Sequence, residues 1–236
     1  MVTARLQRAD AAMCGRFTNQ YTWRELHALY MLSIGFEQNE EWAPKFNIPP
    51  TTQIPVILRE KGQRRAQLMR WGLVPSWAKG IGKFSTFNAR ADGVASKPGF
   101  RGAWKAGQRC IVPASSYFEW CQSDRQPFAI ALGNKGPIAF AGLWDECRPK
   151  DAKPLRSCTI ITCASNTDLA SVHDRMPVIL GEENWAAWLG EQVANENELT
   201  ALLKPFTPGR LTSWKVGKAV GNVQNQGEEL IASITI

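Results

Sequence analysis

The residues with the most unusual chemistry stand near the start of the chain, in the run Met13-Cys14-Gly15. An initiator methionine is removed before a small residue, so a chain that begins at Met13 would expose Cys14 as its first residue. An N-terminal cysteine carries an amine and a thiol on adjacent carbons, with ordinary pKa values of about 8 and about 8.5. Such an aminothiol condenses with an aldehyde to an imine, and its sulfur then closes a five-membered thiazolidine. If residues precede Cys14, this chemistry requires that they be removed.

Polar side chains further along the chain stand inside apolar, strand-like surroundings. Glu119 lies between Phe118 and Trp120, so strand alternation puts it on the opposite face. A surface position is the first interpretation, and a partly buried acid with a raised pKa, fit for proton transfer, is the second. Taken alone, His173 indicates a loop histidine held by a neighbouring acid. The other polar residues in such surroundings are Asn88, Arg90 and Arg175, and either arginine alone indicates a salt-bridge partner.

Composition places the chain among ordinary globular proteins. It has 236 residues, of which 44% are hydrophobic and 21% are charged, which suits one domain with a sizeable core. No apolar run is long enough for a membrane span, and residues 1–12 have no apolar stretch typical of an export signal. We expect residues 1–12 to be a disordered leader or to precede the true start. Residues 13–236 then form one domain, located in the cytoplasm.

Charge and cysteine usage narrow the partners. The formal net charge of +7 favours a polyanionic partner such as a nucleic acid. The six cysteines form no CxxC pair and only two histidines accompany them, so the sequence predicts no metal site and no cofactor. In a reduced cytoplasm, the five cysteines after Cys14 are expected to be core residues.

Hydrophobic patterning predicts many short strands with helices beside them. Thr22 and Glu25 have the spacing of a capping box, which opens a helix that runs to Tyr30. Helical patterns return at 184–189 and 198–203, and a last strand-like run covers 229–234. The order of elements favours an α+β fold: a single domain on a curled, barrel-like antiparallel sheet with flanking helices. The other strand-like runs cover 53–58, 66–73, 109–112, 116–120, 128–132, 138–144 and 158–162.

The ordered set of these segments resembles the SOS-response-associated peptidase (SRAP) family, the abasic-site processing proteins. The resemblance begins at Cys14-Gly15-Arg16-Phe17 and ends in the run from Ala219 to Gly227. Between them lie Asn-Ala-Arg at 88–90, Phe-Glu-Trp at 118–120 and His-Asp-Arg-Met-Pro at 173–177. No single segment is decisive, but their order covers nearly all of the chain after residue 12.

The resemblance implies a covalent trap for abasic sites in single-stranded DNA. An abasic deoxyribose opens to an aldehyde, and Cys14 is the implied nucleophile that becomes the thiazolidine. Asn88 is implied to hydrogen-bond the sugar remnant and to position the cysteine amine. Glu119 is implied to shuttle protons during imine and ring formation. His173 is implied to protonate the sugar ring oxygen and so drive ring opening.

The family also implies how the DNA is held. Arg16 and Arg90 are expected to contact the phosphates that flank the lesion, with Arg175 as a weaker candidate. Trp77 is expected to pack on a base or sugar, a contact that tolerates any sequence. Phosphate contacts without base readout predict binding that weakens strongly with salt. We expect a monomer that binds no membrane.

Three other functions remain open at this point. A thiol peptidase using Cys14 and His173 would turn over a peptide and form no DNA adduct. A non-covalent single-stranded-DNA-binding module would use the basic surface and Trp77 alone. A structural protein would bury Cys14. The family name also leaves room for self-cleavage before Cys14, with Glu119 and His173 nearby.

Overall fold

A computed structural model describes residues 15–33, 42–82, 86–150 and 152–234. Cys14, the predicted nucleophile, and the predicted leader at residues 1–12 lie outside these described residues. None of the helices in the described part is long and apolar enough to cross a membrane.

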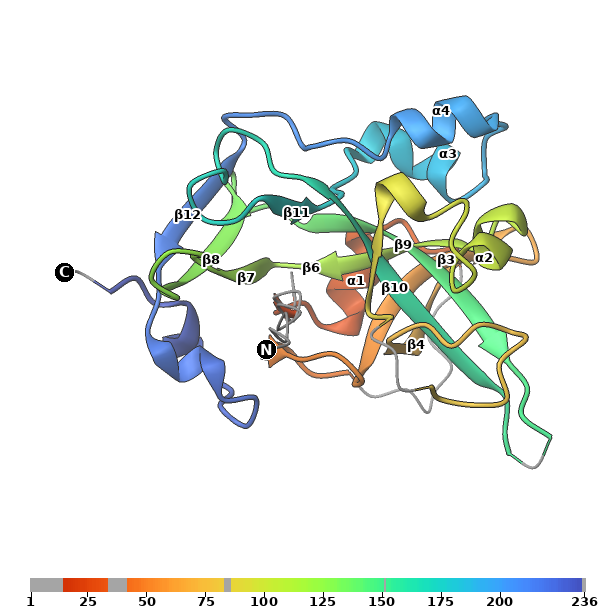
Figure 1. The fold of residues 1–236 in the computed structure, drawn as a ribbon, viewed down its shortest axis with the longest axis horizontal. Helices are drawn as coiled ribbons and strands as arrows, with labels where there is room; N and C mark the ends of the chain where they lie inside the picture. Colours follow the sequence, from red (N-terminus) through yellow and green to blue (C-terminus); the bar gives the residue numbers. More distant parts are fainter. Residues whose placement is uncertain (1–14, 34–41, 83–85, 151, 235–236) are drawn as a thin grey trace, which may run out of the picture.

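The centre of the fold is a barrel in which strand β10 closes the ring (Figure 1). β10 pairs with β9 along one edge and with β4 along the other, and β4, β3, β6 and β9 pair in that order. The pairings in the ring are antiparallel except β4–β10, which is parallel and joins two residue pairs. Five strands of the described chain form the ring: β3 (Gln53–Glu60), β4 (Gln63–Trp71), β6 (Arg109–Ala114), β9 (Ile138–Cys147) and β10 (Leu155–Ala164).

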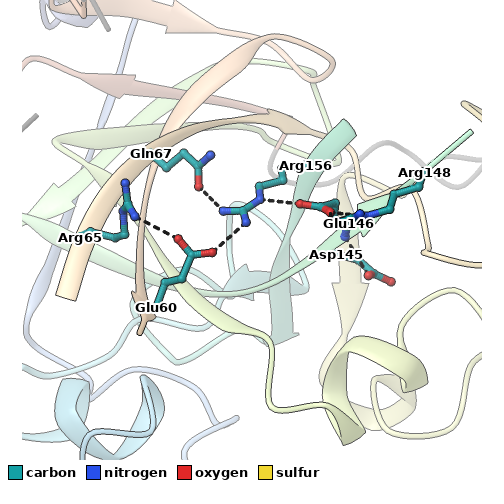
Figure 2. A network of polar contacts seen from close by, with 7 residues as sticks. All are labelled: Glu60, Arg65, Gln67, Asp145, Glu146, Arg148 and Arg156. Atoms are coloured by element: carbon teal, nitrogen blue, oxygen red, sulfur yellow. Dashed lines mark hydrogen bonds and ion pairs between the residues drawn. The ribbon is translucent and has the colours of Figure 1, made fainter. Parts of the chain in front are cut away.

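A network of polar side chains crosses the short seam between β4 and β10 (Figure 2). Arg156 of β10 donates to Gln67 of β4 at 2.7 Å and to Glu60 of β3 at 2.7 Å. Its Nε donates to Glu146 of β9 at 2.8 Å, and its guanidinium lies 5.2 Å from the ring centroid of Trp144. One guanidinium therefore links four strands around the seam, where backbone pairing is shortest.

A second, antiparallel sheet lies beside the barrel, with β12, β8 and β7 on the left in Figure 1. Its order is β12-β8-β7-β1-β2. Phe17 of β1 packs edge-on against Trp71 and Phe140 of the barrel, so one hydrophobic core joins both sheets. The strands are β1 (Arg16–Asn19), β2 (Lys45–Ile48), β7 (Ser116–Trp120), β8 (Pro127–Leu132) and β12 (Leu211–Lys215).

Two short strands flank β10, and short helices cover the barrel. β5 (Asn88–Arg90) pairs in parallel with β10, and β11 (Arg175–Pro177) pairs with it antiparallel. α3 and α4 lie close together at the upper right of Figure 1, and α2 lies at the right end of the barrel. The helices are α1 (Trp23–Leu29), α2 (Arg101–Lys105), α3 (Trp185–Trp188) and α4 (Glu196–Ala201), with short 3-10 turns η1 (Ala91–Gly93), η2 (Glu182–Asn184), η3 (Lys218–Gly221) and η4 (Glu228–Ile231).

The predicted fold class is confirmed, and so is the first helix. Thr22 accepts from the backbone N–H of Glu25 at 3.3 Å, and the Glu25 carboxylate accepts from the N–H of Thr22 at 2.7 Å. The helix buries Leu26 on the side that faces the core. The predicted strand at 66–73 ends at Trp71, because Gly72 has φ +129°, which side chains rarely adopt.

The predicted strand at 229–234 is wrong. Residues 228–231 form the 3-10 turn η4, and only Ser233 makes an isolated bridge, to Val216. The turn buries Leu230 and offers the carbonyl oxygen of Ile231 to Nε1 of Trp214 at 2.8 Å. β1, β2 and β12 are strands that the hydrophobic patterning did not predict, and β12 pairs with β8 over five residues.

Candidate functional site

Glu119 lies in β7, the middle strand of the second sheet, and is buried, with 3% of its surface exposed. The surface position that strand alternation favoured is therefore wrong. The sheet is covered on both faces: Tyr117 packs on Phe140 of the barrel, with ring centroids 5.7 Å apart, and Phe118 packs against residues near the C-terminus. Glu119 alternates with Phe118 and so shares the barrel face of the sheet with Tyr117. A carboxylate is thus held inside the fold, as the second interpretation requires, while its raised pKa and its proton transfer stay predictions.

His173 is also buried, and its segment contacts the end of β7. The backbone N–H of Gln122 donates to the carbonyl of Val172 at 3.2 Å, and its side chain donates to Asp174 at 3.0 Å. Gln122 follows Glu119 by three residues. The loop that carries the imidazole is therefore hydrogen-bonded, on both sides of His173, to the residue two positions beyond the end of β7.

The protonation of His173 is governed mainly by burial, which lowers its pKa below the usual 6.5. Asp174 lies 3.0 Å from Nδ1 and opposes this shift, but its side chain is 70% exposed and water weakens its pull. Nδ1 also accepts the backbone N–H of Arg175 at 3.1 Å. A proton on Nδ1 would suit the Asp174 carboxylate, whereas the N–H of Arg175 needs Nδ1 unprotonated. Because burial favours the neutral ring, the proton is expected on Nε2.

Arg90 and Arg175 lie on the two flanks of one residue of β10, Thr162. Thr162 is the register partner of Arg90 across β5. Arg175, on the other side, donates to the carbonyl oxygen of Thr162 at 2.8 Å and to its Oγ1 at 2.9 Å. Burial lowers the pKa of Arg175, and the neighbouring positive charge of Arg90 lowers it further. The two guanidinium groups therefore lie near each other at the end of β10, with Asp92 paired to Arg90, and we call these two arginines the basic surface.

Asn88 is the first residue of β5, on the same edge of β10 as Arg90, and its register partner is Ile160. The residue before it is fixed, because Trp71 Nε1 donates to the carbonyl of Phe87 at 2.8 Å. Asn88 and Arg90 are two residues apart on one strand and so share a face. β10 therefore brings the Asn-Ala-Arg and His-Asp-Arg-Met-Pro segments to its two edges.

Among the predicted site residues that the structure describes, Trp77 is the most exposed, with 69% of its surface accessible. Its Nε1 donates to the carbonyl of Pro98 at 3.4 Å. The preceding residue, Lys97, is exposed, and its stem lies against Gly93, with Cε 3.0 Å from the place of a Cβ there. Lys97 also helps to lower the pKa of Asp92, the ion-pair partner of Arg90. Lys97 therefore lies between the Trp77 contact at Pro98 and the basic surface. Nothing in its sequence context singled it out.

Arg16 is separated from that surface. It opposes Phe118 in the β1–β7 ladder and therefore lies on the face away from Glu119. Its Nη1 donates to Asn47 Oδ1 at 3.0 Å and to the carbonyl of Val220 at 2.7 Å, and Nη2 donates to the carbonyl of Gly221 at 3.3 Å. Burial lowers the pKa of this guanidinium. Its phosphate contact stays a prediction.

Asn47 explains why the run from Ala219 to Gly227 belongs to the fold. Its side chain is fully buried and donates to the carbonyl oxygens of Val220, Asn222 and Asn225 at 3.2, 3.0 and 3.2 Å. Gln226 completes the contact, because its Oε1 accepts from the backbone N–H of Asn47 at 3.2 Å. A buried asparagine among apolar residues is the signal that could have pointed to this position.

The thiols of the described residues are buried, as expected. Burial raises the pKa of Cys163 to about 11 and also raises that of Cys110, Cys147 and Cys158. A thiol with a raised pKa is a poor nucleophile. Within the described ranges, no group of three or more histidine, cysteine, aspartate or glutamate side chains could hold a metal ion.

The described site residues thus comprise a buried acid, a buried imidazole, two arginines near the end of β10 and an exposed tryptophan. The profile of the SOS response associated peptidase (SRAP) family matches residues 13–223, and the chain belongs to this family. It is 35% identical to the abasic site processing protein YoqW of Bacillus subtilis, over 94% of this chain and 100% of that protein. It is 30% identical to the abasic site processing protein HMCES of Gallus gallus, over 95% of this chain and 79% of that protein.

Solved structures agree on the fold. A protein of Bacteroides thetaiotaomicron superposes with a TM-score of 0.81, covering 94% of this chain and 100% of that chain at 23% identity. A protein of Bordetella bronchiseptica superposes with a TM-score of 0.73, covering 86% of this chain and 100% of that chain at 24% identity. At this level of identity the likeness concerns architecture alone.

Proposed function

We propose that this protein recognises abasic sites in single-stranded DNA and joins itself to them through Cys14, which shields the lesion. The relatives that match nearly the whole chain are named abasic site processing proteins, which supports this substrate. The observation on this chain that carries the proposal is the burial of Glu119 beside strand β1. Arg16 of β1 opposes Phe118, the residue before Glu119, and Cys14 precedes Arg16 by two residues. Chain connectivity limits the distance between the Cα atoms of Cys14 and Arg16 to about 7 Å.

The chemistry is a condensation in two steps. The amine of Cys14 adds to the aldehyde of the opened deoxyribose, and loss of one water gives an imine. The thiolate of the same residue then attacks the imine carbon, and the nitrogen takes up a proton. The product is a five-membered thiazolidine. Because amine and thiol belong to one residue, the second step is intramolecular, where effective molarities reach about 10⁵ to 10⁸ M.

Glu119 and His173 supply the proton transfers in this proposal. Carbinolamine formation needs a proton acceptor, and expulsion of water needs a donor, which one carboxyl group can be in turn. His173 donates through Nε2 to the ring oxygen of the sugar as the ring opens, and Asn88 hydrogen-bonds the opened sugar. The hydrogen bonds between the His173 loop and Gln122, three residues after Glu119, support a shared site for these groups.

The DNA contacts follow from the basic surface. Arg90, Arg175 and Lys97 bind phosphates, and Trp77 stacks on a base. The exposure of Trp77 and the convergence of the two arginines at Thr162 support this assignment. The raised thiol pKa values elsewhere support Cys14 as the nucleophile. Cys14 acquires its free amine by initiation at Met13 with loss of the methionine, or by cleavage before Cys14.

The test compares proteins on single-stranded DNA that contains one abasic site. A chain that starts at Met13, the full chain, and Cys14→Ser in the shorter chain are each mixed with the DNA and separated on a denaturing gel. We expect a heat-stable shifted band for the shorter chain, none for Cys14→Ser, and a band for the full chain only after its first residues are lost. Intact-mass measurement identifies which form carries the DNA.

Substitutions assign the groups. Glu119→Gln and His173→Gln should each slow appearance of the band, by about 100-fold or more for a positioned acid or base, while binding of intact DNA persists. Turnover of a peptide without any DNA adduct would instead indicate a thiol peptidase. Equal binding of abasic and intact DNA by the shorter chain, without a band, would indicate a non-covalent binding module.

A further inference from the structure

The loop that carries Trp77 is fastened to the barrel at every second residue. The N–H of Gly72 donates to the carbonyl of Cys158 at 2.8 Å, and the N–H of Val74 donates to Ser157 Oγ at 2.8 Å. The N–H of Ser76 donates to Asp145 Oδ2 at 2.8 Å. The next contact comes from the barrel side, where the thiol of Cys147 donates to the carbonyl of Ala78 at 3.0 Å. The two residues that flank Trp77 are therefore both anchored, one by its N–H and one by its C=O.

The side chains that make these anchors form one row on the barrel. Asp145 and Ser157 are register partners across the β9–β10 ladder, and Cys147 follows Asp145 by two residues, on the same face of β9. Asp145 is 4% exposed, and both Ser157 and Cys147 are fully buried. Figure 2 shows the Asp145 carboxylate pointing away from Arg156 and the network on the other face. We call Asp145, Ser157 and Cys147 the Trp77 cradle.

The contacts of Asp145 indicate that the cradle serves the loop. Its Oδ2 accepts from Ser76 and its Oδ1 accepts from the N–H of Glu146 at 2.8 Å. A buried carboxylate without such donors would be costly, because burial removes its hydration. The carboxylate thus holds the backbone of the loop through a charge-assisted hydrogen bond, which is stronger than a neutral one.

Trp77 is held in an exposed position, where it gains little free energy from burial. A large apolar side chain gains free energy when it leaves water, so a mobile loop would tend to fold the indole against the protein. Anchors at Ser76 and Ala78 prevent this, and the single contact of the indole Nε1 with Pro98 leaves its surface 69% exposed. A side chain ordered before binding loses less entropy when a ligand arrives.

We propose that Asp145 and Cys147 are positioning residues that hold Trp77 ready to stack on an unpaired nucleobase of any sequence. This inference rests on the proposed binding of single-stranded DNA, but not on the covalent step at Cys14. Neither residue touches the base, and each acts through the backbone on one side of Trp77.

The experiment measures affinity for an intact, unmodified single-stranded oligonucleotide by fluorescence anisotropy, using the full chain. Stacking on one aromatic side chain corresponds to about a 5- to 150-fold loss of affinity in Trp77→Ala. We expect Asp145→Ala to show most of that loss, and Asp145→Ala with Trp77→Ala to bind as Trp77→Ala alone, within about twofold. Losses that multiply in the double variant would overturn the proposal, as would full affinity in Asp145→Ala.

Conservative variants separate positioning from a general loss of structure. Asn retains an oxygen for the N–H of Ser76, so Asp145→Asn should recover most of the affinity. Ser retains a donor for the carbonyl of Ala78, so Cys147→Ser should bind more tightly than Cys147→Ala. If Asp145→Ala does not fold, the two Cys147 variants carry the test, and equal affinities for them would refute it.

Hydrogen exchange gives a readout without DNA. The amide of Ser76 should exchange faster in Asp145→Ala than in the unaltered protein, while the amides of β3 and β4 keep their protection. Unchanged exchange at Ser76 would contradict the anchor itself. Normal binding of intact DNA without an abasic-site adduct would refute the proposed covalent function and leave the cradle standing.

Discussion

Arg16 and Glu119 lie on opposite faces of one sheet, although their strands β1 and β7 pair directly. Arg16 opposes Phe118, so its guanidinium lies on the face of Phe118 and Trp120, 5.9 Å from the Trp120 ring centroid. Glu119 points to the barrel face. Consecutive residues of β1 therefore contact opposite faces of the sheet: Phe17 packs in the barrel core, and Arg16 binds the segment around Val220.

This arrangement predicts that Arg16 contributes more to stability than to phosphate binding. Arg16→Ala removes hydrogen bonds to Asn47, Val220 and Gly221, and should lower the free energy of unfolding by about 1 to 3 kcal/mol. Urea denaturation measures it, with the exposed Arg24→Ala as a matched control. A phosphate contact would instead reduce the salt dependence of DNA binding, by about 0.7 in the log–log slope for a single strand.

A second prediction concerns Asp92, which pairs with Arg90 through Oδ2 and Nη2 at 2.6 Å. Arg90 lowers the pKa of Asp92, so the carboxylate is ionised at neutral pH and competes with DNA phosphate for the guanidinium. Both side chains are largely exposed, and the pair is therefore weak. Asp92→Asn should strengthen binding of single-stranded DNA about twofold to fivefold at low salt. Glu182→Gln, the same charge change on η2, should alter the affinity less.

Much of this fold follows from local patterns, and the failures have physical causes. The capping box at Thr22 predicted α1 because both partners lie within one turn. Glu119 was misjudged because alternation reports which face a residue takes and not what covers that face. The strand β12 was missed because only Leu211 in it is buried, so its pairing with β8 left little apolar pattern.

The candidate site, like the fold, could be predicted only in part from local patterns. Segments such as Asn-Ala-Arg could be singled out as motifs, but their meeting depends on β10, which pairs with β5 and β11 on its two edges. Trp77 lies near Lys97 because its Nε1 donates to the carbonyl of Pro98, a contact between residues 21 positions apart. Contacts of that kind arise from topology, and no periodicity of the sequence contains them.

His173 predicts a specific dependence of stability on pH. Burial lowers its pKa below 6.5 in the folded protein, whereas the unfolded chain has the ordinary value. As the pH falls through 6.5 the unfolded state binds the proton first, so stability from this residue is lost down to the lowered pKa and no further. His173→Gln should remove this contribution, which chemical denaturation from pH 5 to 8 would detect.

Asp174 provides the control for that measurement. Its charge raises the pKa of His173, so Asp174→Asn should lower the pKa and extend the loss of stability to more acidic pH. A difference between the wild-type protein and His173→Gln that stays constant with pH would contradict the assignment of burial as the dominant cause.

The last prediction concerns the barrel seam, where Arg156 links Glu60, Glu146 and Gln67 (Figure 2). Arg156→Met keeps an unbranched stem beside Trp144 but removes the hydrogen bonds, and should lower the free energy of unfolding by about 1 to 2 kcal/mol at pH 7. Hydrogen bonding to Arg156 is the main cause that lowers the pKa of both acids. Their contribution is therefore present above the ordinary pKa of 4.5 and is lost as the pH falls through the lowered values.

The pH dependence of the network therefore gives a stricter test than one unfolding measurement at pH 7. The stabilities of Arg156→Met and the wild-type protein should converge as the pH falls below the lowered pKa values of Glu60 and Glu146, where both carboxylates are protonated. Arg148→Met is the matched control, because Arg148 is 76% exposed and pairs with Glu146 alone among the residues of Figure 2. It should change the free energy of unfolding by less than about 0.5 kcal/mol. Equal effects of the two substitutions would mean that the seam does not depend on Arg156.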